Sequence, residues 1–254
     1  GHLNKVHPLS FNREYAPTVL GRHARWLSML TATVAGWLGS AVVHMAVAAP
    51  TMAADPQSDA VFQDAREAWR ARDRVRLNAD RDALIANGHV LAPWADYWSL
   101  GLRWSGVSPD EVDAFLARWG DAYVADRARN DWLLELGRRQ DWVTFLRVLP
   151  ACKMNDDREV TCYAYLARFQ QQVPMGNAPD WREQARQAWW YQKDPDQGCD
   201  AMAKGLLAAG VFNQSDVWVK LRLALEGDKF KTVQQSSRFL DDNVAQAVNR
   251  MLSQ

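Results

Sequence analysis

The distribution of apolar positions predicts helices along most of the chain. From residue 58 onward, apolar side chains recur at the three- and four-residue spacing that places them on one face of an α-helix. The spacing is clearest in two adjoining stretches, the first with Val124, Ala128, Trp132 and Leu136 and the second with Trp142, Phe145, Leu146 and Leu149. Alternating runs of β-branched residues, which are typical of strands, are nearly absent. The pattern therefore predicts an all-α fold.

The joint between these two stretches predicts an αα-hairpin. We expect Gly137 to relax the end of the first helix, with Arg138 and Arg139 beside its negative end. Asp141 suits the start of the second helix, and Pro150 stops it. The tryptophans of both helices then face inward. An aromatic box for a ligand is the alternative to this packing interpretation.

Short breaks separate further helices on both sides of the hairpin. The run from Ser108 to Glu111 carries a capping box, with Pro109 at the first helical position. Later helices are predicted over 158–173, 180–192, 196–209, 214–226 and 236–253. Pairs of helices recur roughly every 30 to 40 residues without a strict consensus, which is typical of an α-solenoid. We therefore expect a curved, tetratricopeptide-like superhelix of degenerate helical hairpins.

The first 54 residues differ from the rest. Arg22, His23 and Arg25 precede a long apolar run rich in small residues, and Ala48 and Ala53 each end a sequence typical of signal-peptidase sites. Residues 1–54 are therefore interpreted as an export signal region, in which the residues before Arg22 need not belong to the native chain, and residues 55–254 as the helical domain. An uncleaved inner-membrane anchor is the alternative, because the apolar run is long for a signal.

Composition narrows the classes of partner and chemistry. The 254 residues include 30 basic and 30 acidic side chains, and no basic run stands out, which argues against nucleic acid. His89 is the only histidine after residue 54, and a solvated turn is its expected setting rather than a catalytic triad. The pairs Asp156-Asp157 and Asp241-Asp242 fit helix starts. We predict no catalytic residue, no cofactor and no metal site in this chain.

After export, the three cysteines are expected to lie in an oxidising compartment. One disulfide and one free thiol are then the simplest outcome. Cys162 and Cys199 each lie in the first turns of a predicted helix, with one helix between them, so their turns can approach. Cys152 follows Pro150 in a loop and is also available. These positions alone leave the pairing open.

Scattered positions across residues 58–250 form a pattern of short motifs in the predicted helices: Asp141-Trp142, Cys162-Tyr163-Ala164-Tyr165, Trp189, Cys199-Asp200 and Arg222-Leu223-Ala224. This pattern resembles the N-terminal superhelical domain of the soluble lytic transglycosylases. Members of that family are periplasmic enzymes that cleave the glycan strands of peptidoglycan. The resemblance implies a Cys162–Cys199 disulfide with Cys152 free. Stacking of an aromatic face on a sugar ring is the one binding role that stays open for Trp94, Trp98 and Trp104.

The sequence departs from the family in one respect. The family's catalytic module is lysozyme-like, with a Glu followed by Ser and a later Gly-Leu-Met-Gln stretch, and neither occurs here. The resemblance thus implies a non-catalytic scaffold domain, with glycan strands and other periplasmic cell-wall proteins as partners and a catalytic domain expected after Gln254. Whether the chain itself is an enzyme stays open. The alternative function is an independent periplasmic helical-repeat adaptor that binds proteins.

Overall fold

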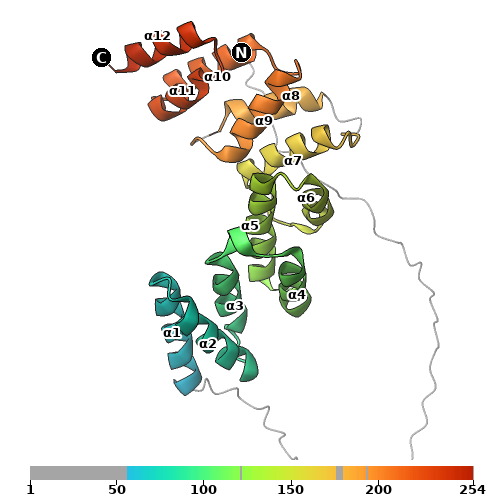
Figure 1. Cartoon of the computed structure of the whole chain (residues 1–254), viewed down its shortest axis with the longest axis vertical. Coiled ribbons are helices and arrows are strands. Elements are labelled where there is room, and N and C mark those ends of the chain that lie inside the picture. The colour runs from blue at the N-terminus through green and yellow to red at the C-terminus, as the bar shows by residue number, and fades with distance from the viewer. Residues whose placement is uncertain (1–55, 121, 176–179, 193, 254) are drawn as a thin grey trace, which may run out of the picture. The chain divides into compact units, whose positions relative to one another are not determined.

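The computed structural model describes residues 56–120, 122–175, 180–192 and 194–253, and these contain helices and no strand (Figure 1). The α-helices are α1 (Pro56–Arg70), α2 (Arg74–Ala86), α3 (Ala92–Gly101), α4 (Pro109–Trp119), α5 (Tyr123–Arg139), α6 (Trp142–Val148), α7 (Arg158–Gln170), α8 (Trp181–Trp190), α9 (Gln197–Ala208), α10 (Gln214–Glu226), α11 (Phe230–Ser237) and α12 (Asp242–Leu252). Two short 3₁₀ turns, η1 (Trp104–Gly106) and η2 (Leu149–Ala151), join them. The predicted all-α class is confirmed.

Each helix packs mainly on helices that are near it in the sequence. α1, α2 and α3 contact one another, α3 and α4 contact α5, and α5 contacts α6 and α7. Further along, α7 packs on α8 and α9, α8 packs on α10, and α10, α11 and α12 follow in order. Among these main contacts none joins α1–α4 to α7–α12. Packing between near neighbours is the defining property of a helical solenoid.

The core is divided in the same way into three clusters of buried side chains. The first lies around Leu77, Leu84 and Trp98 in α2 and α3. The second surrounds Trp132 and Phe145 in α5 and α6. The third lies in α7–α11 and has these fully buried residues at its centre: Trp189, Met202, Leu206 and Phe212. Because each cluster is filled by adjacent helices, no single central core is needed.

The α5–α6 hairpin forms as predicted except at its joint. α5 runs past Gly137 to Arg139, and Gln140 takes the left-handed conformation (φ 57°) that ends it. Gly137 lies inside the helix. A glycine is needed there because a Cβ would overlap the ring of Tyr163 on α7. Asp141 then begins α6, its carboxylate accepting from Thr144 N at 3.1 Å. The glycine is therefore explained by a tertiary contact and not by a helix end.

The last predicted helix, 236–253, is wrong as a single element. α11 begins at Phe230 and ends at Ser237, and α12 begins at Asp242. Between them Leu240 turns inward and is only 6% exposed, packing into the third core cluster. A single helix over 236–253 would conflict with this inward turn, so the helix is interrupted between Ser237 and Asp242. The capping box of Ser108 and Glu111 at the start of α4 is present as predicted.

The predicted export signal lies in residues 1–54, outside the described residues. Within the described part of the chain, none of the helices combines the length and the apolar character needed to cross a bilayer.

Candidate functional site

A row of aromatic rings runs from α1 across α3 to the start of α5. Trp69 stacks on Trp98 with ring centroids 5.1 Å apart, Trp98 lies 6.4 Å from Trp94, and Trp94 lies 6.3 Å from Tyr123. We call these four residues the aromatic row. Trp94 and Trp98 share one face of α3 because they are four residues apart. Three separate helices thus bring the row together.

The exposed ring surface lies at the two ends of the row. Tyr123 is 66% exposed and Trp69 is 37% exposed, whereas Trp98 is 8% exposed and also stacks against Phe62. Trp94 is half-buried. Trp98 therefore packs against the ring of Trp69 and exposes little ring surface of its own. Aromatic rings with an open face are the groups that stack on the apolar faces of other rings.

A polar cluster adjoins the row where α3 meets α5. The Tyr97 hydroxyl donates to Asp131 Oδ2 at 2.5 Å, and Arg127 Nε donates to the Tyr97 oxygen at 3.2 Å. Tyr97 itself contacts Trp94 edge to face at 6.1 Å. Tyr123, Arg127 and Asp131 are spaced four residues apart, so one face of α5 carries them all. The cluster places hydrogen-bonding groups beside exposed rings.

Burial raises the pKa values of Tyr97 and Asp131 in this cluster. Burial and the hydrogen bond to Asp131 raise the pKa of Tyr97 to about 12, so its hydroxyl stays protonated at physiological pH. Burial also raises the pKa of Asp131, against the lowering effect of Tyr97 and Arg127. A protonated hydroxyl, a carboxyl group and a guanidinium together can donate and accept hydrogen bonds. They contain no activated nucleophile.

Of the three tryptophans singled out in the sequence, Trp104 lies apart from the row. It belongs to η1 and stacks on Trp132 with centroids 6.1 Å apart. Arg139 lies over the ring of Trp132, 4.9 Å from its centroid. Arg139 also donates a hydrogen bond to the main-chain oxygen of Trp104 at 2.6 Å. Trp104 is half-buried in the second core cluster. These contacts favour a packing role for Trp104.

Sequence reasoning missed most of this site. Trp69, Tyr97, Tyr123, Arg127 and Asp131 were not singled out, because they come from three helices and meet only in the fold. The four-residue spacing of Tyr123, Arg127 and Asp131 is the one signal in the sequence that could have found them.

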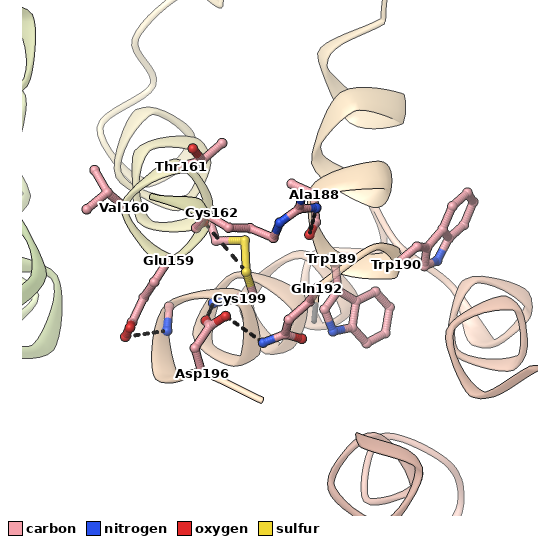
Figure 2. The surroundings of a disulfide bond; sticks show 12 residues. Glu159, Val160, Thr161, Cys162, Ala188, Trp189, Trp190, Gln192, Asp196 and Cys199 are labelled. Carbon is pink, nitrogen blue, oxygen red and sulfur yellow. Dashed lines mark hydrogen bonds between the residues drawn. A yellow bond between two sulfur atoms is a disulfide. The ribbon is translucent and has the colours of Figure 1, made fainter. Parts of the chain in front are cut away.

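A disulfide joins Cys162 on α7 to Cys199 on α9, with Cα atoms 4.8 Å apart and both side chains fully buried (Figure 2). Hydrogen bonds surround it: Glu159 Oε1 accepts from Gly198 N at 3.2 Å, and Asp196 Oδ1 accepts from Cys199 N at 2.7 Å. This is the pair that the resemblance implies. Cys152 is half-buried and free, and burial raises the pKa of its thiol to about 11. A thiol of that pKa is a poor nucleophile at neutral pH.

Three buried carboxyl groups with raised pKa values lie around the disulfide and on α9, and each is hydrogen-bonded within the fold. Burial raises the pKa of Glu159, Asp196 and Asp200. Each of these carboxylates, however, already accepts hydrogen bonds from the chain, Asp200 from Gln235 and Arg238. No group of three metal-ligating side chains exists among the described residues. The buried acids therefore hold α7, α9 and α11 in place.

His89 sits in the turn before α3, but it is not solvated as expected. Its side chain is 8% exposed, stacks on Phe62, and approaches Asp59 at 3.0 Å through Nε2. Its Nδ1 accepts from Leu91 N at 3.1 Å. The turn histidine is thus packed against α1, because Phe62 and Asp59 close over it. Both ring nitrogens are engaged, Nε2 by Asp59 and Nδ1 by the Leu91 amide, so neither is left to activate a nucleophile as in a catalytic triad.

No protein-family model matches the chain, and no curated protein matches it significantly. Among solved structures, the 70-kDa soluble lytic transglycosylase in complex with bulgecin A matches with a TM-score of 0.54 and 18% identity, over 78% of this chain and 31% of that one. The lytic transglycosylase Slt from Pseudomonas aeruginosa, solved as an inactive mutant, matches with a TM-score of 0.49 and 23% identity, over 72% of this chain and 28% of that one. This chain therefore spans less than a third of either protein. The resemblance read from the sequence is confirmed at the level of fold: the chain shares the helical fold of the matched part of the 70-kDa soluble lytic transglycosylase.

Proposed function

We propose that residues 55–254 are a non-catalytic scaffold domain of a periplasmic peptidoglycan lytic transglycosylase, and that this domain holds glycan strands. In this proposal residues 1–54 direct export, and the aromatic row contacts sugar rings. Other cell-wall proteins of the periplasm are further candidate partners.

The observation that carries the proposal is the aromatic row on a fold shared with a lytic transglycosylase. Trp69 and Tyr123 expose ring surface at its ends, and the hydroxyl, carboxyl and guanidinium groups of the polar cluster lie beside it. Sugar rings have apolar C–H faces and hydroxyl edges. The exposed aromatic faces can stack on the C–H faces of a sugar, and the hydrogen-bonding groups of the polar cluster can bind its hydroxyl groups.

A scaffold role fits the acidic groups better than a catalytic one. Glycosidic bond cleavage needs a carboxylic acid that is free to protonate the leaving oxygen. The buried acids Glu159, Asp196 and Asp200 are instead bonded within the fold. We therefore do not assign glycosidic cleavage to these three carboxyl groups.

An oxidising compartment fits the cysteines. The buried Cys162–Cys199 bond ties α7 to α9, and such bonds persist where thiols are not kept reduced. The periplasm is such a compartment, so the disulfide supports the proposed location.

Incubation with purified peptidoglycan sacculi tests the proposal. The protein should sediment with the sacculi and release no soluble muropeptides above a buffer control. Release that is abolished by changing one Glu or Asp of this chain would refute the scaffold role. Protein that stays in the supernatant would refute glycan binding.

One observation favours the alternative, a protein-binding adaptor. Trp218 on α10 and Phe230 on α11 are 49% and 56% exposed, and large apolar side chains on a surface are typical of protein interfaces. Under this alternative the protein does not sediment with sacculi, and Trp218→Ala weakens the capture of a periplasmic protein.

A further inference from the structure

His89 lies at a joint where three helices meet. Its main-chain N–H donates to the main-chain oxygen of Leu84 on α2 at 2.9 Å, and its own main-chain oxygen accepts from the N–H of Ala92, the first residue of α3, at 2.9 Å. Its ring stacks on Phe62 of α1 with centroids 5.8 Å apart. The function proposed above does not use this residue.

A series of stacked rings connects His89 to the aromatic row. Phe62 stacks on Trp98 with centroids 5.4 Å apart, and Trp98 stacks on Trp69 at 5.1 Å. Consecutive rings from His89 to Trp69 are inclined to one another by 18°, 26° and 11°. Phe62 and Trp69 are two turns apart on α1, about 10.5 Å, so the ring of Trp98 from α3 lies between them. The stack therefore fixes α1 against α3 at the row.

A second connection runs through the main chain at the start of α3. The N–H of Leu91, the residue before the helix, donates to Nδ1 of His89 at 3.1 Å. The main-chain oxygen of Leu91 accepts from the N–H of Trp94 at 3.0 Å. Trp94 is the ring of the row that lies between Trp98 and Tyr123. The imidazole of His89 thus supports the turn of α3 that carries Trp94.

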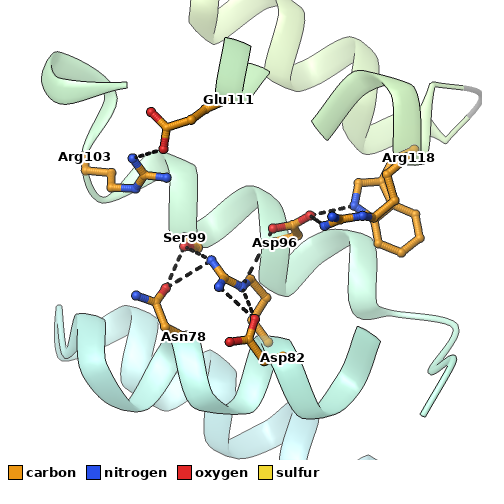
Figure 3. A network of polar contacts seen from close by, with 9 residues as sticks. Asn78, Asp82, Asp96, Ser99, Arg103, Glu111 and Arg118 are labelled. Atoms are coloured by element: carbon orange, nitrogen blue, oxygen red, sulfur yellow. Dashed lines mark hydrogen bonds and ion pairs between the residues drawn. The ribbon is translucent and has the colours of Figure 1, made fainter. Parts of the chain in front are cut away.

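The second half of α3 is held by different contacts. Figure 3 shows them: the Ser99 hydroxyl donates to Asn78 Oδ1 of α2 at 2.7 Å, and Asp96 Oδ2 accepts from Arg118 of α4 at 3.0 Å. The first turn of a helix opens more readily than its middle, because its N–H groups have no partner within the helix. A change at His89 therefore acts on the first turn of α3, while the rest of the helix stays in place.

The hydrogen bonds of the imidazole define its protonation state. Because Nδ1 accepts from the N–H of Leu91, it carries no proton, and Nε2 carries the proton that is donated to Asp59 Oδ1 at 3.0 Å. A second proton on Nδ1 would point at the N–H of Leu91 and remove that hydrogen bond. Imidazoles as a class change their charge between about pH 5 and 8. Mild acid can therefore break the contact between His89 and the start of α3.

Asp59 is the charged group that faces the imidazole. Residues 56–63 of α1 include no other Asp, Glu, Lys or Arg, and residues 83–95, from the end of α2 into α3, include none. The carboxylate favours a protonated ring, but its side chain is 55% exposed, and an exposed ion pair contributes little. The side chain of His89 is only 8% exposed, where two opposed N–H donors are costly. Protonation should therefore release Leu91.

We propose that His89 is a positioning residue for the aromatic row and that protonation of its ring weakens the binding of glycan by the row. When the ring is neutral, it holds Leu91 and the turn that carries Trp94. When the ring is protonated, this turn loosens and Trp94 shifts away from Tyr123. The proposal rests on the glycan-holding function proposed above, and it adds that acid releases the strand.

Sedimentation with peptidoglycan sacculi at pH 7.5 and pH 5.5 tests the proposal. The matched variant is His89→Asn, which keeps an acceptor oxygen close to the position of Nδ1 and takes up no proton in this range. Its pH effect measures the other titrating groups, among them Asp131, whose pKa is raised by burial. The loss of binding at pH 5.5 should be about fivefold larger for the native protein than for His89→Asn, which corresponds to one typical hydrogen bond.

Two further variants separate positioning from a general effect on the fold. His89→Phe keeps a ring on Phe62 but offers no acceptor, so at pH 7.5 it should bind sacculi more weakly than His89→Asn. Asp59→Asn removes the charge that favours protonation, so the loss of binding should move to lower pH. Circular dichroism at both pH values checks that each variant is folded.

Nitrogen NMR of histidine-labelled protein provides a readout without glycan. At pH 7.5 the Nδ1 of His89 should carry no proton, and the indole N–H signal of Trp94 should shift as the imidazole gains its second proton. A proton on Nδ1 at pH 7.5 would overturn the proposal.

The sedimentation results distinguish this proposal from the glycan-holding function. Binding at pH 7.5 with the same pH effect in the native protein and in His89→Asn refutes the role of His89 alone. Absence of binding by the native protein at pH 7.5 refutes the glycan-holding function, and the role of His89 falls with it. A larger pH effect in the native protein, with the loss moved to lower pH in Asp59→Asn, supports both.

Discussion

The side-chain amine of Lys220 on α10 is fully buried and donates a hydrogen bond of 2.5 Å to the main-chain oxygen of Trp189 on α8. It also reaches the main-chain oxygen of Trp190 and the side-chain oxygen of Gln192. The last carbonyl groups of a helix have no partner within the helix. Lys220 therefore caps the end of α8 from a neighbouring helix and joins α8 to α10.

This contact predicts a pH dependence of stability. Burial lowers the pKa of Lys220 to about 8, although Asp196 and Asp200 act against the shift. The unfolded chain keeps a pKa near 10.5, so between pH 8 and 10.5 it binds more protons than the folded chain. The free energy of unfolding contributed by this group should rise with pH across that window, by on the order of 3 kcal/mol.

Urea unfolding at pH 7.5, 9 and 10 measures the effect against Lys220→Met. Burial raises the pKa values of Cys152, Tyr97 and Tyr163, so these groups give the opposite trend above pH 9, and subtraction of the variant removes their contributions. The difference in unfolding free energy between the native protein and the variant should shift in favour of the native protein as pH rises. A constant difference would mean that the pKa of Lys220 is the same in the folded and the unfolded protein, so that the buried amine stays charged across this range.

The disulfide should be the main covalent support of the α7–α9 contact. Closing a loop of 37 residues by this bond should stabilise the fold by about 3 to 4 kcal/mol on the chain-entropy model. The double variant Cys162→Ser, Cys199→Ser should lose about that much, and Cys152→Ser should lose less than about 1 kcal/mol. Non-reducing peptide mapping of exported protein checks the pairing. A major crosslink that contains Cys152 would contradict it.

Gly137 should tolerate no side chain. Alanine at this position would overlap the ring of Tyr163, and overpacking of this kind costs about 1 to 3 kcal/mol. Gly106 provides the matched control, because nothing lies within 4 Å of a Cβ built there. Thermal unfolding of Gly137→Ala and Gly106→Ala measures both. Equal stability of the two variants would show that α5 and α7 do not pack as closely as described.

The two tryptophans of the α5–α6 hairpin, Trp132 and Trp142, should contribute different amounts to the free energy of unfolding. Trp132 is 1% exposed, so Trp132→Ala should cost about 3 to 5 kcal/mol. Trp142 is only half-buried, against Phe145 and Tyr163, and Trp142→Ala should cost less than Trp132→Ala. Denaturant titration of both variants gives the order. A loss below about 1 kcal/mol for Trp142→Ala would make it a candidate for sugar stacking.

Local signals in the sequence predicted the helices, and contacts between distant residues explain the errors. The start of α4 was predictable because Ser108 and Glu111 form their capping box within four residues. Gly137 was assigned to a helix end because Tyr163, the residue that excludes a side chain there, is on another helix. The break before Asp242 was missed because Leu240 is drawn inward by the third core cluster, which the local pattern does not show.

The candidate site was predictable only in part for the same reason. Trp94 and Trp98 were found because both lie in one aromatic helix, α3. Trp69 and Tyr123, which expose the ring surface at the ends of the row, come from α1 and α5. Only the packing of α1 and α5 on α3 brings them beside the other two.

Sedimentation with sacculi of paired variants tests the proposed glycan-holding role most directly. The double variant Trp69→Ala, Tyr123→Ala removes the exposed ends of the aromatic row, and Trp218→Ala removes a comparably exposed ring on α10. We predict that the double variant binds sacculi about tenfold more weakly than the native protein, with Trp218→Ala unchanged. Equal binding by the double variant and the native protein, with both variants folded, would contradict the account.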